Sequence, residues 1–195
     1  VQYVVALDKR TGKTVWRRDR NIDYGTDNGD RKKAYSTAQL IEVDGQRQLI
    51  SPSAMETIAY DPANGDVIWR VKHGGMNAAI RPLFANGLIY IAAGDGAKEM
   101  IAVRPTGKGD VTSTHIEWSL GRSVPKRPSQ VVIGDRLFMI DDKSVASCLD
   151  AKTGKVIWQE RLGGGEYRAS PLAVNGIIYC FSTTGETKVF EASEK

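Results

Sequence analysis

Hydrophobic residues occur along this chain in short runs that turn residues separate. The runs at 4–7 and 67–69 are typical of strands, and the longest runs, at 88–93 and 176–181, are also strand-sized. None approaches the roughly 20 apolar residues that a membrane-spanning helix needs. The pattern therefore predicts an all-β protein without a transmembrane segment.

One turn sequence recurs three times with identical spacing, within residues 6–16, 59–69 and 148–158. In each copy an Asp is followed after three residues by Thr or Asn, then directly by Gly, and four residues later by Trp. The Asp side chain accepts hydrogen bonds in a tight reversal and the Gly adopts a left-handed conformation, so the motif predicts strand, turn and strand. A fourth copy, at 102–118, is altered, because Trp118 comes six residues late when counted from Ala102.

A second set of turn dipeptides precedes the later copies, which doubles the number of strands in each repeat. These dipeptides are Asp44-Gly45, Asn86-Gly87, Gly134-Asp135 and Asn175-Gly176. The four tryptophans lie 53, 49 and 40 residues apart. Four-stranded units at such intervals are what the radial repetition of small antiparallel sheets requires, so the pattern predicts a β-propeller.

The repeated motif, Ala-x-Asp-x-x-Thr-Gly-x-x-x-Trp, resembles the tryptophan-docking motif of the pyrroloquinoline-quinone (PQQ) repeat superfamily. That superfamily includes quinoprotein dehydrogenases and the lipoprotein scaffold of outer-membrane protein assembly. The resemblance covers nearly the whole chain and implies that Trp16, Trp69 and Trp158 each sit between adjacent blades, with Trp118 at a displaced docking position. It does not by itself select a function.

The repeats divide the chain into three full blades and two partial ones. We expect a half blade at 1–18, full blades at 35–71, 78–120 and 127–162, and an incomplete blade at 168–191. The family resemblance implies a ring of six to eight blades, so we expect the chain to be part of a larger propeller.

Two segments interrupt the repeats. In the polar stretch 19–34, four side chains could be imagined as calcium ligands: Asp23, Asp27, Asn28 and Asp30. Their spacing fits no EF-hand, so we expect a solvated connection between blades. The insertion within 104–115 replaces a tight turn with Gly and polar residues, which favours an exposed, mobile excursion.

Composition narrows the candidate chemistry further. The 195 residues carry a net charge of +4 and a pI of about 9.0, which permits anionic partners without the concentrated basic face of a nucleic-acid binder. Cys148 and Cys180 form no metal or redox motif, and Cys148 takes the place of a small buried alanine. His73 and His115 have no ligand-spaced partners, so we expect surface histidines and no metal site.

The strongest candidate site is the set of connections that lead from one blade to the next and converge near the propeller axis. Arg or Lys recurs just before a proline in each of them. The cations of these segments are Arg81, Arg122, Lys126, Arg127 and Arg168. Together they predict a positively charged mouth for carboxylate or phosphate groups, and the alternative is that strand ends simply carry solvated charge.

An enzymatic function finds little support. Quinoproteins, by the same resemblance, carry vicinal cysteines, calcium ligands and a Trp platform, and here all four tryptophans are assigned to docking positions. Asp141 and Asp142 resemble solvated turn acids, and Ser170 lacks the context of a nucleophile. We therefore expect no catalytic residues and no cofactor.

The sequence thus favours a non-catalytic scaffold that binds a protein or peptide, with an acidic partner suited to the arginine-rich mouth. The alternative is part of a quinoprotein oxidoreductase whose catalytic residues lie outside this chain, and a third hypothesis is a sensor of small anions or sugars. The family resemblance implies a periplasmic or exported location. Two copies could also join head to tail as a homodimer that completes a ring.

Overall fold

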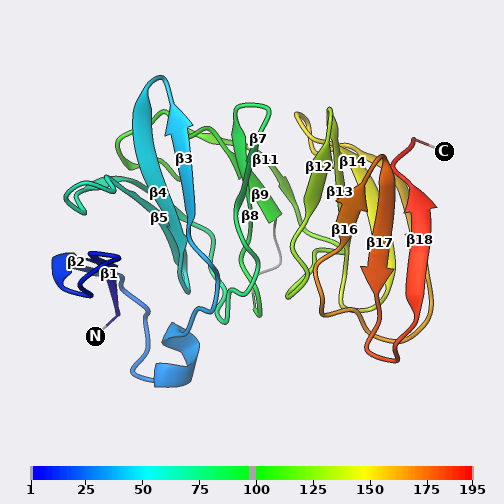
Figure 1. The fold of residues 1–195 in the computed structure, drawn as a ribbon, viewed down its shortest axis with the longest axis horizontal. Coiled ribbons are helices and arrows are strands. Elements are labelled where there is room, and N and C mark those ends of the chain that lie inside the picture. Colours follow the sequence, from blue (N-terminus) through cyan, green and yellow to red (C-terminus); the bar gives the residue numbers. More distant parts are fainter. Residues whose placement is uncertain (1, 97–99, 195) are drawn as a thin grey trace.

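The computed structural model describes residues 2–96 and 100–194, and it consists almost entirely of strands and turns (Figure 1). The strands form five sheets, which stand side by side in chain order from β1 and β2 at one end to β18 at the other. Within each sheet, neighbouring strands along the chain pair antiparallel, as expected for a meander. The short helix η1 (Gly29–Lys32) interrupts the connection between the first two sheets.

The sheets contain two, four, four, four and three consecutive strands, and the second sheet gains one further strand. The first sheet holds β1 (Tyr3–Leu7) and β2 (Thr14–Asp19); the second, β3 (Gln39–Val43), β4 (Gln46–Pro52), β5 (Glu56–Tyr60) and β6 (Val67–Lys72). The third holds β7 (Leu83–Ala85), β8 (Leu88–Ala92), β9 (Met100–Val103) and β11 (Ile116–Leu120); the fourth, β12 (Val131–Ile133), β13 (Arg136–Ile140), β14 (Val145–Asp150) and β15 (Val156–Arg161); the fifth, β16 (Leu172–Val174), β17 (Ile177–Phe181) and β18 (Thr187–Glu191).

The repeated turn explains why its strands pair in a fixed register. Asp8 Oδ1 accepts hydrogen bonds from the backbone nitrogens of Arg10 and Thr11, at 3.1 and 2.8 Å, and from the Thr11 hydroxyl. Asp150 repeats these contacts in the fourth sheet. These hydrogen bonds lower the pKa of both carboxyl groups, with the bond from the Thr side chain as the largest cause. The turn is therefore locally encoded.

The hydrophobic core lies between successive sheets. One cluster joins Ile50 and Trp69 of the second sheet to Ile101 of the third. A second cluster joins Tyr90 of the third sheet to Leu137 of the fourth, and a third lies between the fourth and fifth sheets. Four-stranded sheets that stack face to face in chain order form a partial β-propeller, so the predicted fold class is confirmed.

The expectation of an exposed excursion at 104–115 is wrong for Val111, which is buried, whereas Gly109 and Asp110 are exposed as expected. Gly109 and Asp110 form strand β10, which pairs parallel with β6 and makes the second sheet five-stranded. Val111 donates its backbone N–H to Arg70 O at 2.9 Å, and its side chain is buried beside Trp69. The segment is held because burying Val111 and pairing the open edge of β6 both favour the ordered conformation.

The expectation of a surface position for His73 is also wrong, because the side chain is only partly exposed and is hydrogen-bonded on both nitrogens. Nε2 lies 3.0 Å from Thr57 Oγ1, and Nδ1 lies 2.7 Å from Gly74 O. Burial lowers the pKa of His73 to about 4, although the Gly74 contact opposes the shift. His115 is partly exposed and hydrogen-bonds Thr114 through Nδ1 at 2.7 Å.

Candidate functional site

The inter-sheet connections and the loops between the second and third strands of the sheets meet at one end of the molecule, along the lower edge of Figure 1. We call this end the connection face. Its connections are 20–38, 73–82, 121–130 and 162–171, and its loops are 53–55, 93–96, 141–144 and 182–186.

Each connection is hydrogen-bonded to a neighbouring loop. Met76 and Asp95 exchange two backbone hydrogen bonds of 2.8 Å, and Thr183 N donates to Glu166 O at 2.8 Å. In the fourth sheet the Asp142 carboxylate accepts from Lys126 N at 2.7 Å. These bonds give the connection face a defined shape, which is what a binding surface on loops requires.

The final residues of the four connections are also joined to one another. Ser36 Oγ donates to Ile80 O at 2.6 Å, Arg81 N donates to Ser129 Oγ at 3.1 Å, and Ser129 N donates to Ser170 Oγ at 2.9 Å. These contacts place the segments that carry Arg81, Arg127 and Arg168 next to one another along neighbouring sheets. The Ser170 hydroxyl therefore accepts a hydrogen bond from a backbone N–H.

Three of the five predicted cations have acidic partners. Lys126 Nζ lies 3.1 Å from Asp95, and Arg168 Nη2 lies 2.8 Å from Glu166. Arg127 Nη1 lies 2.5 Å from Asp142, and this hydrogen bond raises the pKa of Arg127. The hydrogen bond from Lys126 lowers the pKa of Asp95. These acids offset much of the positive charge at this part of the face.

Arg81 and Arg122 are exposed, and within residues 2–96 and 100–194 neither forms an ion pair. They are therefore the predicted cations whose charge is most available to a partner. No contact among residues 2–96 and 100–194 joins all five side chains. A shared positively charged mouth therefore stays a prediction.

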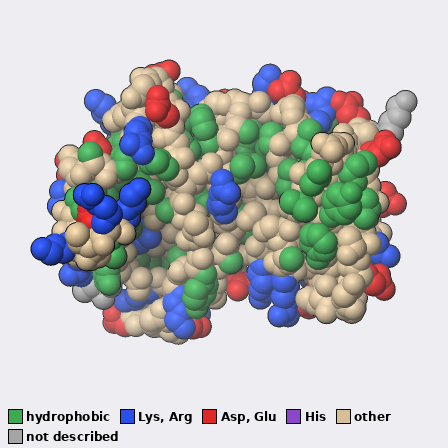
Figure 2. All heavy atoms as spheres, viewed as in Figure 1, with side chains coloured by type: hydrophobic (Ala, Val, Ile, Leu, Met, Phe, Trp, Pro, Cys, Tyr) green, Lys and Arg blue, Asp and Glu red, His purple; other side chains and the backbone are tan. Residues whose placement is uncertain are grey.

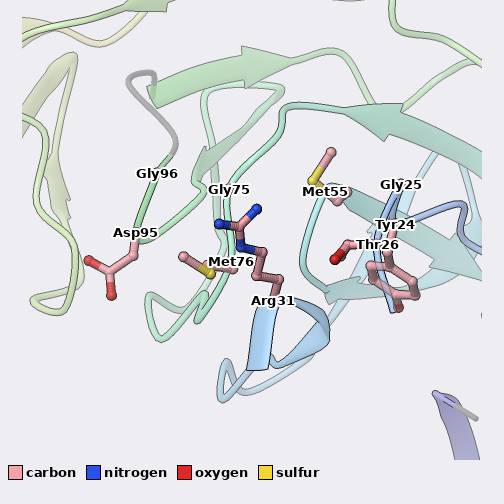
Figure 3. Close-up of a pocket in the computed structure, with 9 residues that line it drawn as sticks. All are labelled: Tyr24, Gly25, Thr26, Arg31, Met55, Gly75, Met76, Asp95 and Gly96. Carbon is pink, nitrogen blue, oxygen red and sulfur yellow. The ribbon is translucent and has the colours of Figure 1, made fainter. Parts of the chain in front are cut away.

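A cavity of about 340 Å³ lies on the connection face between the first three sheets (Figure 3). Tyr24, Thr26 and Arg31 of the first connection line it together with Met55 and Met76; Met55 lies near Thr26, and Arg31 lies beside Met76. Tyr24 and Arg31 were not predicted from the sequence, since they lie in a polar stretch without periodicity. A lone Tyr within that stretch is the one signal that could have indicated packing.

The acidic residues considered for metal binding or catalysis form hydrogen bonds or ion pairs with residues close to them in the sequence. Asp23 caps Gly25 N at 2.9 Å, Asp30 pairs with Lys33, and Asp141 accepts from Lys143 N and Val145 N. In the part of the chain that the structure describes, no three His, Cys, Asp or Glu side chains group as metal ligands. Both cysteines are buried and unpaired, and burial raises the pKa of Cys180 to about 12.

Two of the tryptophans contact the repeated turn of the following sheet. Trp16 Nε1 donates to Pro62 O at 3.0 Å, and Trp118 Nε1 donates to Ala151 O at 3.1 Å. A Cβ on Gly65 would lie 2.5 Å from the Trp16 ring, and one on Gly154 would lie 2.5 Å from the Trp118 ring. The turn glycine is therefore required twice, for its positive φ and for the close approach of the indole.

The other two tryptophans have different partners. Trp69 is fully buried, and its Nε1 donates to Gln48 Oε1 at 2.8 Å, while Gln48 Nε2 donates to Pro105 O in the third sheet's turn. Trp158 is partly exposed, donates to Ser193 O at 2.9 Å and meets Phe190 edge to face. A role in blade docking for all four is a proposal that these contacts support.

The stacked antiparallel sheets define the class of protein, which is a β-propeller of the PQQ-like repeat superfamily. The sequence profile described as outer membrane protein assembly factor BamB matches residues 1–133 and 115–194, and the chain belongs to this family. Membership of this family makes the location periplasmic or exported, as expected.

Individual relatives agree with this assignment. The chain is 24% identical over 198 residues to the outer membrane protein assembly factor BamB of Moranella endobia (strain PCIT), covering 93% of this chain and 48% of the relative. The crystal structure of BamB from Moraxella catarrhalis superposes with a TM-score of 0.66 at 13% identity, covering 98% of this chain and 52% of that one. The chain spans about half the length of the curated relatives it matches.

The same fold also occurs in an enzyme. Quinohemoprotein alcohol dehydrogenase from Comamonas testosteroni superposes with a TM-score of 0.63 at 14% identity, covering 91% of this chain and 38% of that one. At this identity the likeness shows the fold alone.

No helix within residues 2–96 and 100–194 is long and apolar enough to span a membrane.

Proposed function

We propose that this protein is a non-catalytic scaffold that binds a protein partner during outer-membrane protein assembly. The observation that carries the proposal is the BamB family match over both halves of the chain. The connection face supports it, because the backbone of Arg81 is hydrogen-bonded to Ser129, and because Arg81 and Arg122 are exposed and form no ion pair within residues 2–96 and 100–194. Arginines on a rigid surface suit an acidic segment of a partner, since they form charge-assisted hydrogen bonds with carboxylates.

The test is complementation in cells that lack the gene. We expect loss of the gene to lower the amount of folded outer-membrane β-barrel proteins, and the parent gene to restore it. The variant carrying Arg81→Glu and Arg122→Glu should restore much less, because it presents like charge to an acidic partner. Lys155→Glu is the matched control, since Lys155 is exposed on the repeated turn of the fourth sheet, away from the connection face.

Equal rescue by the double variant and by Lys155→Glu would exclude the arginines from partner binding. Unchanged β-barrel levels in cells without the gene would exclude the assembly function itself. The amount of soluble variant protein is measured in each case, because a folding defect would also reduce rescue.

The second candidate is a contribution to a quinoprotein oxidoreductase, which the fold likeness to an alcohol dehydrogenase favours. Titration of the purified protein with pyrroloquinoline quinone distinguishes the two. Saturable binding together with dye-linked oxidation of an alcohol or sugar would overturn the scaffold proposal. We expect neither.

We also propose that two copies of the chain associate as a homodimer. The outward faces of the end sheets are apolar and exposed: Tyr3, Val5 and Leu7 on β1, and Leu172, Val174 and Val189 on β16 and β18. Figure 2 shows hydrophobic side chains gathered over the end of the molecule that carries β16 to β18. Covering these faces with a second copy removes apolar surface from water, which is the main driving force for association.

A further inference from the structure

The cavity between Tyr24, Arg31, Met55 and Met76 differs from the rest of the connection face because it combines an apolar lining with an unpaired cation. Its volume of about 340 Å³ falls at the lower end of the range for small-ligand sites. That space accommodates one large side chain with its neighbouring backbone, whereas a folded domain could only cover the opening.

The position of Arg31 follows from the local fold of the first connection. Asn28 caps η1 by accepting from Asp30 N at 2.9 Å, and Arg31 N donates to Asn28 O at 3.1 Å. The helix directs the Arg31 side chain into the cavity, where its guanidinium lies beside Met76 and below Gly75 (Figure 3).

No acidic side chain among residues 2–96 and 100–194 pairs with Arg31. Its neighbours Lys32 and Lys33 pair with Asp27 and Asp30. Asp95 also lines the cavity, yet its carboxylate points away from Arg31 and pairs with Lys126 at 3.1 Å. Among the described residues that line the cavity, Arg31 is the one cation, and a cation without an ion-pair partner there favours a carboxylate.

The two methionines of the lining are suited to contact an apolar side chain. Met55 and Met76 are unbranched and polarisable, and such side chains adapt to the shape of the group they contact. Met55 has a positive φ of 71°, and Asn77, the residue after Met76, has a positive φ of 56°. Backbone hydrogen bonds from Met55 N to Gly75 O and from His73 N to Met55 O hold this strained turn in place. Strained backbone of this kind concentrates at ligand sites.

We propose that this cavity binds an extended peptide segment in which a large apolar side chain lies next to a carboxylate. The apolar side chain contacts Tyr24, Met55 and Met76, and Arg31 binds the carboxylate through its paired N–H groups. The carboxylate is either that of an Asp or Glu or that of a peptide C-terminus. The proposal rests on the scaffold function, since it names the chemistry of a peptide that the scaffold would hold.

Fluorescence polarisation with three labelled peptides tests the proposal. One ends in Leu-Phe with a free carboxylate, the second is its C-terminal amide, and the third carries Phe-Asp ahead of an amide. We expect saturable binding of the first or third peptide, or both, and binding of the second at least about tenfold weaker, as expected for loss of a charge-assisted hydrogen bond. Which acid peptide binds identifies the source of the carboxylate.

Variants locate the site. Arg31→Gln should weaken binding of the acid peptides about tenfold, Arg31→Lys by less, and Met76→Ala several-fold. Arg10→Gln is the matched control, because Arg10 is exposed on the repeated turn of the first sheet, outside the connection face, and its replacement should leave affinity unchanged.

Equal affinity of Arg31→Gln and the parent, an equal loss in Arg10→Gln, or no saturable binding of either acid peptide would overturn the proposal. Complementation separates this failure from failure of the scaffold function. If the Arg81 and Arg122 double variant still fails to rescue while peptides do not bind, only the cavity proposal is wrong.

Discussion

Trp69 is the tryptophan whose surroundings depart most from those of its sequence equivalents. Trp16 and Trp118 each lie against the Gly of an intact turn, whereas the turn that follows Trp69 is the altered copy. Val111 and Gln48 occupy the corresponding space, and the side chain is completely buried. The indole N–H is satisfied inside the protein, so its burial carries no unpaired donor.

Replacing Trp69 tests how much this buried side chain stabilises the fold. Trp69→Ala should lower the free energy of unfolding by about 3 to 5 kcal/mol, because it leaves a large cavity and an unpaired Gln48. Trp158→Ala should cost less, since Trp158 is partly exposed. Urea unfolding of both variants measures the difference. Melting of Trp69→Ala at the parent's temperature would contradict this view of the interface.

His73 makes the stability of the protein dependent on pH. Its pKa of about 4 in the folded state is below the ordinary value of 6.5, because burial disfavours the charged ring. The unfolded chain therefore binds more protons between these values, and stability rises with pH across this window. The contribution is complete above about pH 6.5 and is lost as the pH falls towards 4.

The change attributable to His73 is at most about 3.5 kcal/mol, at about 1.4 kcal/mol per pKa unit. His73→Gln keeps a polar group near Thr57 but does not titrate, so its stability should change less between pH 6.5 and 4 than that of the parent. If chemical denaturation shows that the free energy of unfolding depends on pH in the same way for both proteins, His73 does not titrate in this range.

At the scale of elements, β10 is the feature that breaks the repeat. The insertion in the third sheet crosses to the second sheet and covers the edge strand β6. Lys72 N donates to Thr112 Oγ1 at 3.0 Å, and Lys72 Nζ pairs with Asp110 at 3.0 Å. The hydrogen bond from Thr112 is the largest cause that lowers the pKa of Asp110 to about 2.

Detaching β10 should loosen this edge without unfolding the other sheets. Val111→Asp removes a buried side chain worth roughly 1.5 to 3 kcal/mol and places a charge against Trp69. Hydrogen exchange at the Lys72 amide should become faster, since its bond to Thr112 is lost. Ser113→Asp is the control at an exposed neighbouring position. Unchanged exchange in Val111→Asp would mean that β10 does not depend on Val111.

At the scale of the whole molecule, the end sheets are the surfaces on which we propose that two copies of the chain associate. A head-to-tail dimer would join the two strands of the first sheet to the three of the fifth and give a ring of about eight blades, a size known for propellers. Such a composite sheet has one strand too many, so β1 or β18 must be displaced. Each is well formed in the single chain, so the cost of displacement opposes closure.

Light scattering of the 195-residue chain measures this association. We expect a dimer mass that falls towards the monomer mass in Val189→Asp, because the charge lies on an exposed apolar face. Lys152→Asp is the control on an exposed turn. A monomeric mass for the parent at every accessible concentration would exclude the composite ring.

The sequence by itself determined the repeat, the all-β fold and its family. These features are local or periodic: Asp8 and Asp150 form their turns with residues two and three positions away, so the pattern is readable without the fold. The same local patterning predicted the strand-turn-strand units on which the propeller is built.

Only the tertiary structure decided the details that depend on contacts between distant residues. Val111 reaches Arg70 across 41 residues, and the cavity combines Arg31 and Met76 from two connections with Met55 from a loop. His73 gained a hydrogen bond with Thr57, and three cations gained acidic partners that their spacing did not reveal. Non-periodic segments acquire their conformation from the surfaces they meet, and those surfaces exist only once the sheets have packed.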